Sequence, residues 1–201
     1  MPYPHSPETG SPAHVPGVTA GTTQFTLTLF FPTRGNGGVM ATQQGSLETI
    51  EDFLAQKRIA MAGISRDPAN FSVKLFEELC RRGYDVVPVN PNLQAVQGLR
   101  CYARVQDVQP PVEAVLLMTS PEATETVVHD CAEVGIRRAW MYRAAGKGSV
   151  NAKAVAFCQE QGMRVVPGQC PFMFLPDAAG FHRFHGFVRK ITGRYPRRTP
   201  S

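Results

Sequence analysis

The sequence has no apolar run approaching the ~20 residues that a transmembrane helix needs. Its N-terminus lacks the basic region and apolar core of a signal peptide. The five cysteines are scattered, and none forms a C-x-x-C pair. Neither a disulfide framework nor a zinc site is therefore indicated. We expect a soluble protein of a reducing cytoplasm that holds no metal.

Charged side chains are almost missing from the first 40 residues, where Glu8 and Arg34 are the only ones. Such a segment buries too little apolar surface to offset its ordering entropy. We therefore predict that residues 1–44 form a disordered or loosely attached extension. Residues 24–31 alternate in part like a strand, and either an added edge strand or an exposed apolar patch fits them. A further hypothesis is that Met40 is the natural start and that residues 1–39 are upstream sequence, which mass spectrometry of the native protein tests.

Acidic residues are missing from the other end of the chain. Residues 180–201 hold six of the 21 basic residues and none of the 16 acidic ones, so the net charge of +5 is local. Residues 177–201 are predicted as a basic amphipathic helix and tail, with apolar residues at helical spacing: Phe181, Phe184, Val188 and Ile191. A final helix packed on the domain is favoured. An interfacial membrane helix or a nucleic-acid arm is the alternative.

The three-glycine fingerprint G-x-G-x-x-G of dinucleotide-binding folds is absent too. One glycine, Gly63, lies near the end of a short apolar run that includes Ile59, Met61 and Ile64. Residues 65–70 then have the composition of a loop. Phe71 opens an amphipathic helix. The free N–H groups of a helix start suit phosphate, and glycine lets a ligand approach the backbone. A tight strand-to-helix turn without a ligand explains the pattern equally well.

Strand and helix patterns alternate through the rest of the central region. Strands are expected at residues 84–89, 112–118, 136–142 and 163–166, and helices at 47–56, 121–133 and 150–161. Residues 99–103 fit a short third strand or an extended segment. The alternation predicts an α/β fold over residues 45–176: a single Rossmann-like, doubly wound parallel sheet with helices on both faces. Its ligand loops would start at the carboxyl ends of the strands: Gly63, Asn90, Thr119, Arg143 and Gln169.

The second strand lacks the acid that NAD-binding folds place at its end. The strand instead ends in Val89, Asn90 and Pro91, and Asp85 lies at its start. This counts against NAD.

Five pieces of sequence together resemble a known family: AGISRDPANFS, GYDVVPVNP, GLRCYARVQDV, the Trp140–Met141 pair and the late Cys170–Pro171. Over residues 46–176 the chain resembles the CoA-binding Rossmann domain family in its small stand-alone form. It is similar to the CoA-binding domain of the α subunit of succinyl-CoA synthetase. The family's Gln and Gly after the Trp–Met pair are replaced here by Tyr142 and Arg143, so the thiol end of the site is left open.

The resemblance implies a site for coenzyme A or acyl-CoA. The pyrophosphate would lie at the first loop and helix start: Gly63, Ile64, Ser65, Arg66, Asn70, Phe71 and Ser72. The adenosine would be bordered by Val89, Asn90 and Pro91. The pantetheine arm would pass Met118, Thr119, Ser120 and Pro121, and Tyr142 would complete the site.

Charge and thiol chemistry add further candidates. Four basic side chains near the mouth of the expected ligand site suit phosphate: Arg66, Lys74, Arg143 and Lys147. The alternative for each is a solvated surface charge. Cys170 is the best thiol candidate, although a buried structural role is favoured for it. His129 is expected to pack rather than to catalyse.

The sequence favours a CoA- or acyl-CoA-binding module with no catalytic residue of its own. The ligases that it resembles use a phosphorylated histidine on another domain, which this chain does not supply. The expected partner is a small nucleotide ligand, not a membrane or nucleic acid, and a homodimer is compatible with the sequence. The alternatives are an NADP-dependent oxidoreductase, with Arg66 on the 2′-phosphate, and an interaction protein that uses its basic C-terminal tail on anionic membrane or nucleic acid.

Overall fold

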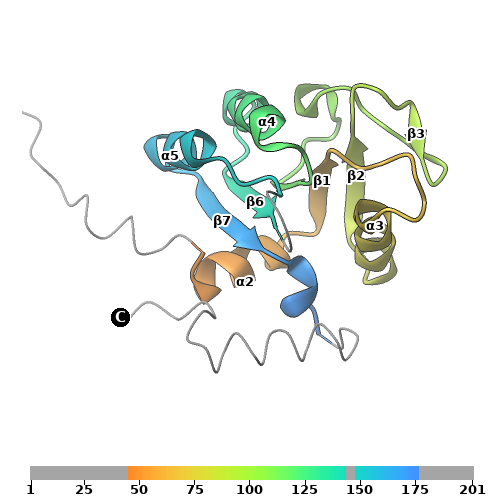
Figure 1. Ribbon diagram of the computed structural model, residues 1–201, viewed down its shortest axis with the longest axis horizontal. Coiled ribbons are helices and arrows are strands. Elements are labelled where there is room, and N and C mark those ends of the chain that lie inside the picture. The colour runs from red at the N-terminus through yellow and green to blue at the C-terminus, as the bar shows by residue number, and fades with distance from the viewer. Residues whose placement is uncertain (1–44, 144–147, 177–201) are drawn as a thin grey trace, which may run out of the picture. The chain divides into compact units, whose positions relative to one another are not determined.

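The computed structural model describes residues 45–143 and 148–176 (Figure 1). The predicted N-terminal extension, the C-terminal helix and residues 144–147 of the basic loop lie outside the described residues. The main helices are α2 (Leu47–Ala55), α3 (Phe71–Arg81), α4 (Pro121–Glu133) and α5 (Ala152–Glu160). The described residues also form two short 3-10 helices, η1 (Val105–Asp107) and η2 (Pro171–Met173).

Five strands form one parallel sheet in the order β2-β1-β5-β6-β7. They are β1 (Arg58–Ala62), β2 (Asp85–Val89), β5 (Ala114–Leu117), β6 (Arg138–Tyr142) and β7 (Arg164–Gln169). Apart from their ends, β1, β2, β5 and β6 are buried, as expected for a parallel sheet covered on both sides, whereas the second half of the edge strand β7 is only partly buried. The predicted α/β fold with a doubly wound parallel sheet is confirmed.

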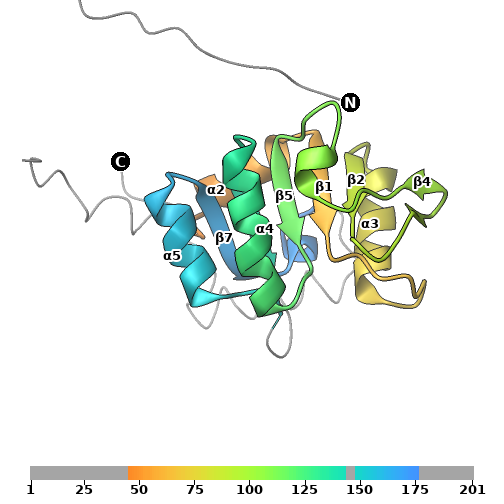
Figure 2. The ribbon, with the colours of Figure 1, turned by 90° about the horizontal axis from the view of Figure 1, so that it is seen from above.

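Alternate residues of each strand face opposite layers. Ile59 and Met61 of β1 join a core with α2, α3 and η2, whereas Ala60 and Ala62 join a core with α4, α5 and η1. Figures 1 and 2 show these two groups of helices on opposite faces of the sheet. The sole tryptophan, Trp140, is fully buried, and its indole N–H donates to the carbonyl of Gln169 at 2.9 Å.

Residues 99–103 do not form a strand of the main sheet. Leu99–Arg100 (β4) pairs antiparallel with Ala95–Val96 (β3) in a separate two-stranded sheet. The turn between them is Gln97–Gly98, and both residues have positive φ (49° and 77°), the geometry of a two-residue hairpin. Of residues 99–103, Tyr102 alone pairs with a strand of the main sheet, through one parallel bridge to Val89.

The last strand is longer than the sequence predicts, because β7 continues through Pro167 and Gly168 to Gln169. These residues were expected to form a loop. β7 lies at the edge of the sheet, where proline is tolerated. A register shift opposite Met141 and Tyr142 accommodates Gly168, whose φ is +71°.

The chain changes direction across the sheet between β1 and β5. From β1 it passes through α3 to β2 on one side, and then returns to β5 on the other side of β1. At this switch point Gly63 follows β1 with φ +85°. A Cβ on Gly63 would lie 2.7 Å from the backbone nitrogen of Thr119, which follows β5. The two loops therefore touch through their backbones, and only glycine fits.

Gly63→Ala should lower the free energy of unfolding by about 3 kcal/mol or more, because it adds a backbone clash to the cost of positive φ. Gly83→Ala is the matched control: its φ is +82°, and nothing lies within 4 Å of the added Cβ. That control should lose only about 1 kcal/mol. Urea denaturation followed by circular dichroism measures both, and equal losses would contradict the close approach.

Candidate functional site

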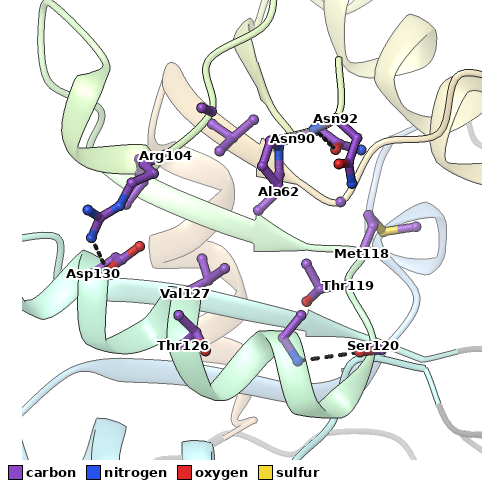
Figure 3. A pocket seen from close by; sticks show the side chains of 16 residues that line it. Ala62, Asn90, Asn92, Arg104, Met118, Thr119, Ser120, Thr126, Val127 and Asp130 are labelled. Atoms are coloured by element: carbon purple, nitrogen blue, oxygen red, sulfur yellow. Dashed lines mark hydrogen bonds and ion pairs between the residues drawn. The ribbon is translucent and has the colours of Figure 1, made fainter.

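A pocket of about 590 Å³, here called the large pocket, lies at the carboxyl ends of β1, β2 and β5 and runs along α4 (Figure 3). Such a position at the switch point is where open parallel sheets bind ligands. The lining residues are Ala62, Gly63, Val89, Asn90, Pro91, Asn92, Ala103, Arg104, Val105, Met118, Thr119, Ser120, Ala123, Thr126, Val127 and Asp130.

A second hollow of about 320 Å³, the small pocket, adjoins it and is also lined by Gly63 and Thr119. It lies between the start of α3 and the end of β6. The lining residues are Gly63, Ser65, Asn70, Phe71, Ser72, Met118, Thr119, Ser120, Tyr142, Gly148 and Ser149. Both pockets share Gly63 and the loop that follows β5, so they adjoin each other.

The structure brings most of the predicted site residues together at these pockets. Those lining the large pocket are Gly63, Val89, Asn90, Pro91, Met118, Thr119 and Ser120. Those lining the small pocket also include Ser65, Asn70, Phe71, Ser72 and Tyr142. Three predicted residues line neither pocket: Ile64 is buried in the core, Arg66 is exposed, and Pro121 begins α4.

Side chains at the start of α3 hold the first loop in shape. The Asn70 carboxamide oxygen accepts from the Ser72 backbone N–H and from the Ser72 hydroxyl, each at 2.9 Å. The same hydroxyl accepts from the Ser65 N–H at 3.0 Å. Asn70 is thus the N-cap of α3, and the cap is tied back to the loop. The loop is fixed beside the positive end of the α3 dipole.

Asn90 connects the loop after β2 to the loop after β1. Its side-chain N–H donates to the carbonyl of Ile64 at 2.8 Å, and its oxygen accepts from the Asn92 N–H at 2.9 Å. The Gly63 N–H donates to the carbonyl of Val89 at 3.0 Å. An uncharged amide that braces two loops therefore occupies the place where NAD-binding folds carry an acid.

One face of α4 forms a wall of the large pocket. Ser120, its N-cap, accepts from the Ala123 N–H at 3.3 Å. The residues that follow on this face, at intervals of three or four, are Ala123, Thr126, Val127 and Asp130. The sequence analysis missed this face, although helical periodicity counted from Ser120 is a signal that could have found it.

Arg104 and Asp130 form an ion pair on the wall of the large pocket, with 2.9 Å between Nη2 and Oδ1 (Figure 3). The Arg104 side chain is 60% exposed, whereas that of Asp130 is 14% exposed. The hydrogen bond to Asp130 raises the pKa of Arg104 above its ordinary value. Sequence reasoning missed both residues, because the connector and α4 are brought together only by the fold.

An aromatic wall borders the small pocket. The ring of Tyr142 stacks on Phe71 with centroids 5.0 Å apart, and Phe71 meets Phe172 edge-on at 5.6 Å. Burial, with a smaller contribution from Cys170, raises the pKa of Tyr142 to about 12, so its phenol stays protonated at neutral pH. Ser149 donates its hydroxyl hydrogen towards the carbonyls of Leu117 and Tyr142, at 2.8 and 3.0 Å, which ties the end of the basic loop to the sheet.

The other candidates lie away from these pockets. Arg66, Lys74 and Arg143 are exposed and line neither pocket, and Lys147 lies outside the described residues. Cys170 is buried and lines neither pocket. Over residues 45–143 and 148–176, no group of three or more His, Cys, Asp or Glu side chains could hold a metal ion. Within the same ranges, no helix has the length and apolar character needed to cross a bilayer.

Two curated proteins show what the chain is similar to. An uncharacterized protein of Bacillus subtilis, YneT, is 26% identical over 129 residues, which cover 64% of this chain and 93% of that protein. The α subunit of an ADP-forming acetate–CoA ligase II of Pyrococcus furiosus is 24% identical over 129 residues. That match covers 60% of this chain but only 28% of the ligase subunit.

Solved structures give a consistent result. A hypothetical protein from Pyrococcus horikoshii superimposes with a TM-score of 0.57 at 30% identity, covering 62% of this chain and 85% of that chain. The apo form of a dinucleotide-forming acetyl-coenzyme A synthetase 1 from Ca. Korarchaeum cryptofilum gives a TM-score of 0.50 at 27% identity. That match covers 58% of this chain and 27% of the synthetase.

The family model described as a CoA binding domain matches residues 57–176, which include the whole sheet and every residue that lines the two pockets. The protein therefore belongs to the CoA binding domain family.

Proposed function

We propose that the large and small pockets together bind coenzyme A or an acyl-CoA, and that the domain acts as a carrier or sensor without a catalytic step of its own. One observation supports this most strongly. In a chain of the CoA binding domain family, the backbone contact of Gly63 with Thr119 leaves two adjoining pockets at the switch point of the sheet.

The shape of the two pockets suits an elongated ligand with a diphosphate near its middle. The diphosphate would lie at Gly63 and the start of α3, where the positive end of the helix dipole favours an anion. The adenosine would enter the large pocket beside Asn90. The pantetheine arm would pass Thr119 and Ser120 towards Tyr142, whose protonated phenol can donate a hydrogen bond.

The chemistry of the lining side chains favours binding over reaction. Hydroxyls, carboxamides and apolar groups predominate, and the Asn70, Ser72 and Asn90 side chains are already engaged in holding the loops. Groups fixed in this way position a ligand at little entropic cost. The matched segment is about a quarter of the ligase and synthetase chains named above, so most of each of those chains lies outside the match.

Ala123→Phe should weaken coenzyme A binding by about tenfold or more, because the added ring occupies the large pocket at the cost of roughly 1.4 kcal/mol or more. Ala123 is exposed on α4, so the fold should tolerate the change. Ala156→Phe, on the exposed face of α5 away from both pockets, is the matched control and should leave affinity unchanged. Calorimetric titration measures both variants. Unchanged affinity in Ala123→Phe would place the ligand elsewhere.

Coenzyme A and acetyl-CoA should bind with affinities within about threefold of each other, because most of the contacts proposed above are made by the shared nucleotide and pantetheine. NADP should bind at least about tenfold more weakly, since it has no pantetheine arm to occupy the small pocket. The same titration with all three ligands tests this. Binding of NADP without binding of coenzyme A would overturn the proposal in favour of an oxidoreductase.

A further inference from the structure

The large pocket is a groove with two chemically different ends. Ser120 and Asp130 are ten residues apart on one face of α4, a length of about 15 Å at the rise of an α-helix. Figure 3 shows Ser120 and Met118 towards one end and the Arg104–Asp130 pair towards the other. A ligand whose phosphates lie at the switch point therefore extends its far end towards the ion pair.

The walls between the two ends are largely apolar. Val89, Val105 and Val127 line the groove together with Ala62 and Ala123. Aliphatic walls suit the flat faces of a purine, which gain dispersion contacts there and lose little hydration. The middle of the groove therefore suits a nucleobase better than it suits a sugar phosphate.

The ion pair offers one acceptor and one donor side by side. Asp130 uses Oδ1 to accept from Arg104 and is mostly buried, so its carboxylate is held in place. The guanidinium has five N–H donors in a fixed plane, of which one Nη2 donor is directed at Asp130. Adenine presents the complementary pattern on one edge, an amino donor beside a ring-nitrogen acceptor.

The surrounding charge disfavours a phosphate at this end. Besides Asp130, the carboxylates of Glu133 and Asp107 lie within electrostatic range of Arg104. Three negative groups around one cation leave the local balance negative, which repels an anion and tolerates a neutral base.

We propose that the Arg104–Asp130 pair recognises the amino edge of adenine, with Asp130 accepting from the N6 amino group and Arg104 donating to the neighbouring ring nitrogen N7. This inference rests on the proposed function and adds to it a determinant of base specificity. Hypoxanthine carries a carbonyl in place of the amino group and thus sets an acceptor against Asp130. Its binding costs the site an unmade hydrogen bond.

The test compares coenzyme A with its analogue in which hypoxanthine replaces adenine, by calorimetric titration of the full chain. The unmodified protein should prefer coenzyme A by about tenfold, the effect of one unmatched polar contact. In Asp130→Asn the preference should fall below about threefold, because a carboxamide can turn its NH₂ towards the carbonyl. Glu133→Gln is the matched control: it removes one negative charge from α4 outside the pocket and should keep the tenfold preference of about 1.4 kcal/mol.

Dephospho-CoA, which lacks the 3′-phosphate, separates base recognition from phosphate recognition. Arg104→Gln should weaken binding of coenzyme A and dephospho-CoA by the same factor. A loss confined to coenzyme A would assign the pair to the 3′-phosphate and overturn the inference. Thermal unfolding checks that Asp130→Asn is as well folded as Glu133→Gln. If it is, an unchanged preference of Asp130→Asn for coenzyme A over the hypoxanthine analogue would also overturn the inference.

The outcomes for the unmodified protein separate the two proposals. Equal binding of coenzyme A and the hypoxanthine analogue would overturn the base inference alone. Binding of neither would overturn the proposed function as well.

Discussion

The backbone contact between Gly63 and Thr119 is the constraint on which the rest of the site depends. It brings the loops after β1 and β5 together at the point where the chain changes direction across the sheet. The starts of α3 and α4 follow directly from these two loops, so both helix N-termini point to the same region. Asn90 then ties the loop after β2 to this contact through the carbonyl of Ile64.

Backbone groups and neutral side chains dominate this region, and charge enters it at the edge. The exposed cations Arg66 and Lys74, which the sequence suggests for phosphate, line neither pocket. The Arg104–Asp130 pair instead lies towards the far end of the large pocket, on α4 and a connector. A neutral amide costs less to desolvate than an ion, so in the proposed function neutral groups make most of the ligand contacts and the ion pair adds one charged contact at the far end.

Local signals predicted the elements well where they were strong. Apolar runs over β1, β2, β5 and β6 and the helical spacing of apolar residues predicted the element boundaries to within a few residues. The sequence did not indicate how residues 99–103 pair, and it predicted a loop where β7 continues, for physical reasons. Gln97 and Gly98 turn the chain into a local hairpin. The edge position of β7 lets Pro167 remain in a strand. Composition alone shows neither the hairpin nor the edge position.

The sequence by itself determined the α/β fold, the order of its elements and the loops that carry Gly63, Asn90 and Thr119, because these depend on periodicity and on backbone freedom at single residues. Only the tertiary structure decided which side chains meet. Arg104 and Asp130 are 26 residues apart and lie on a connector and a helix that become neighbours once η1 packs on α4. A contact of that kind is fixed by the packing of two elements within one layer, which no local pattern encodes.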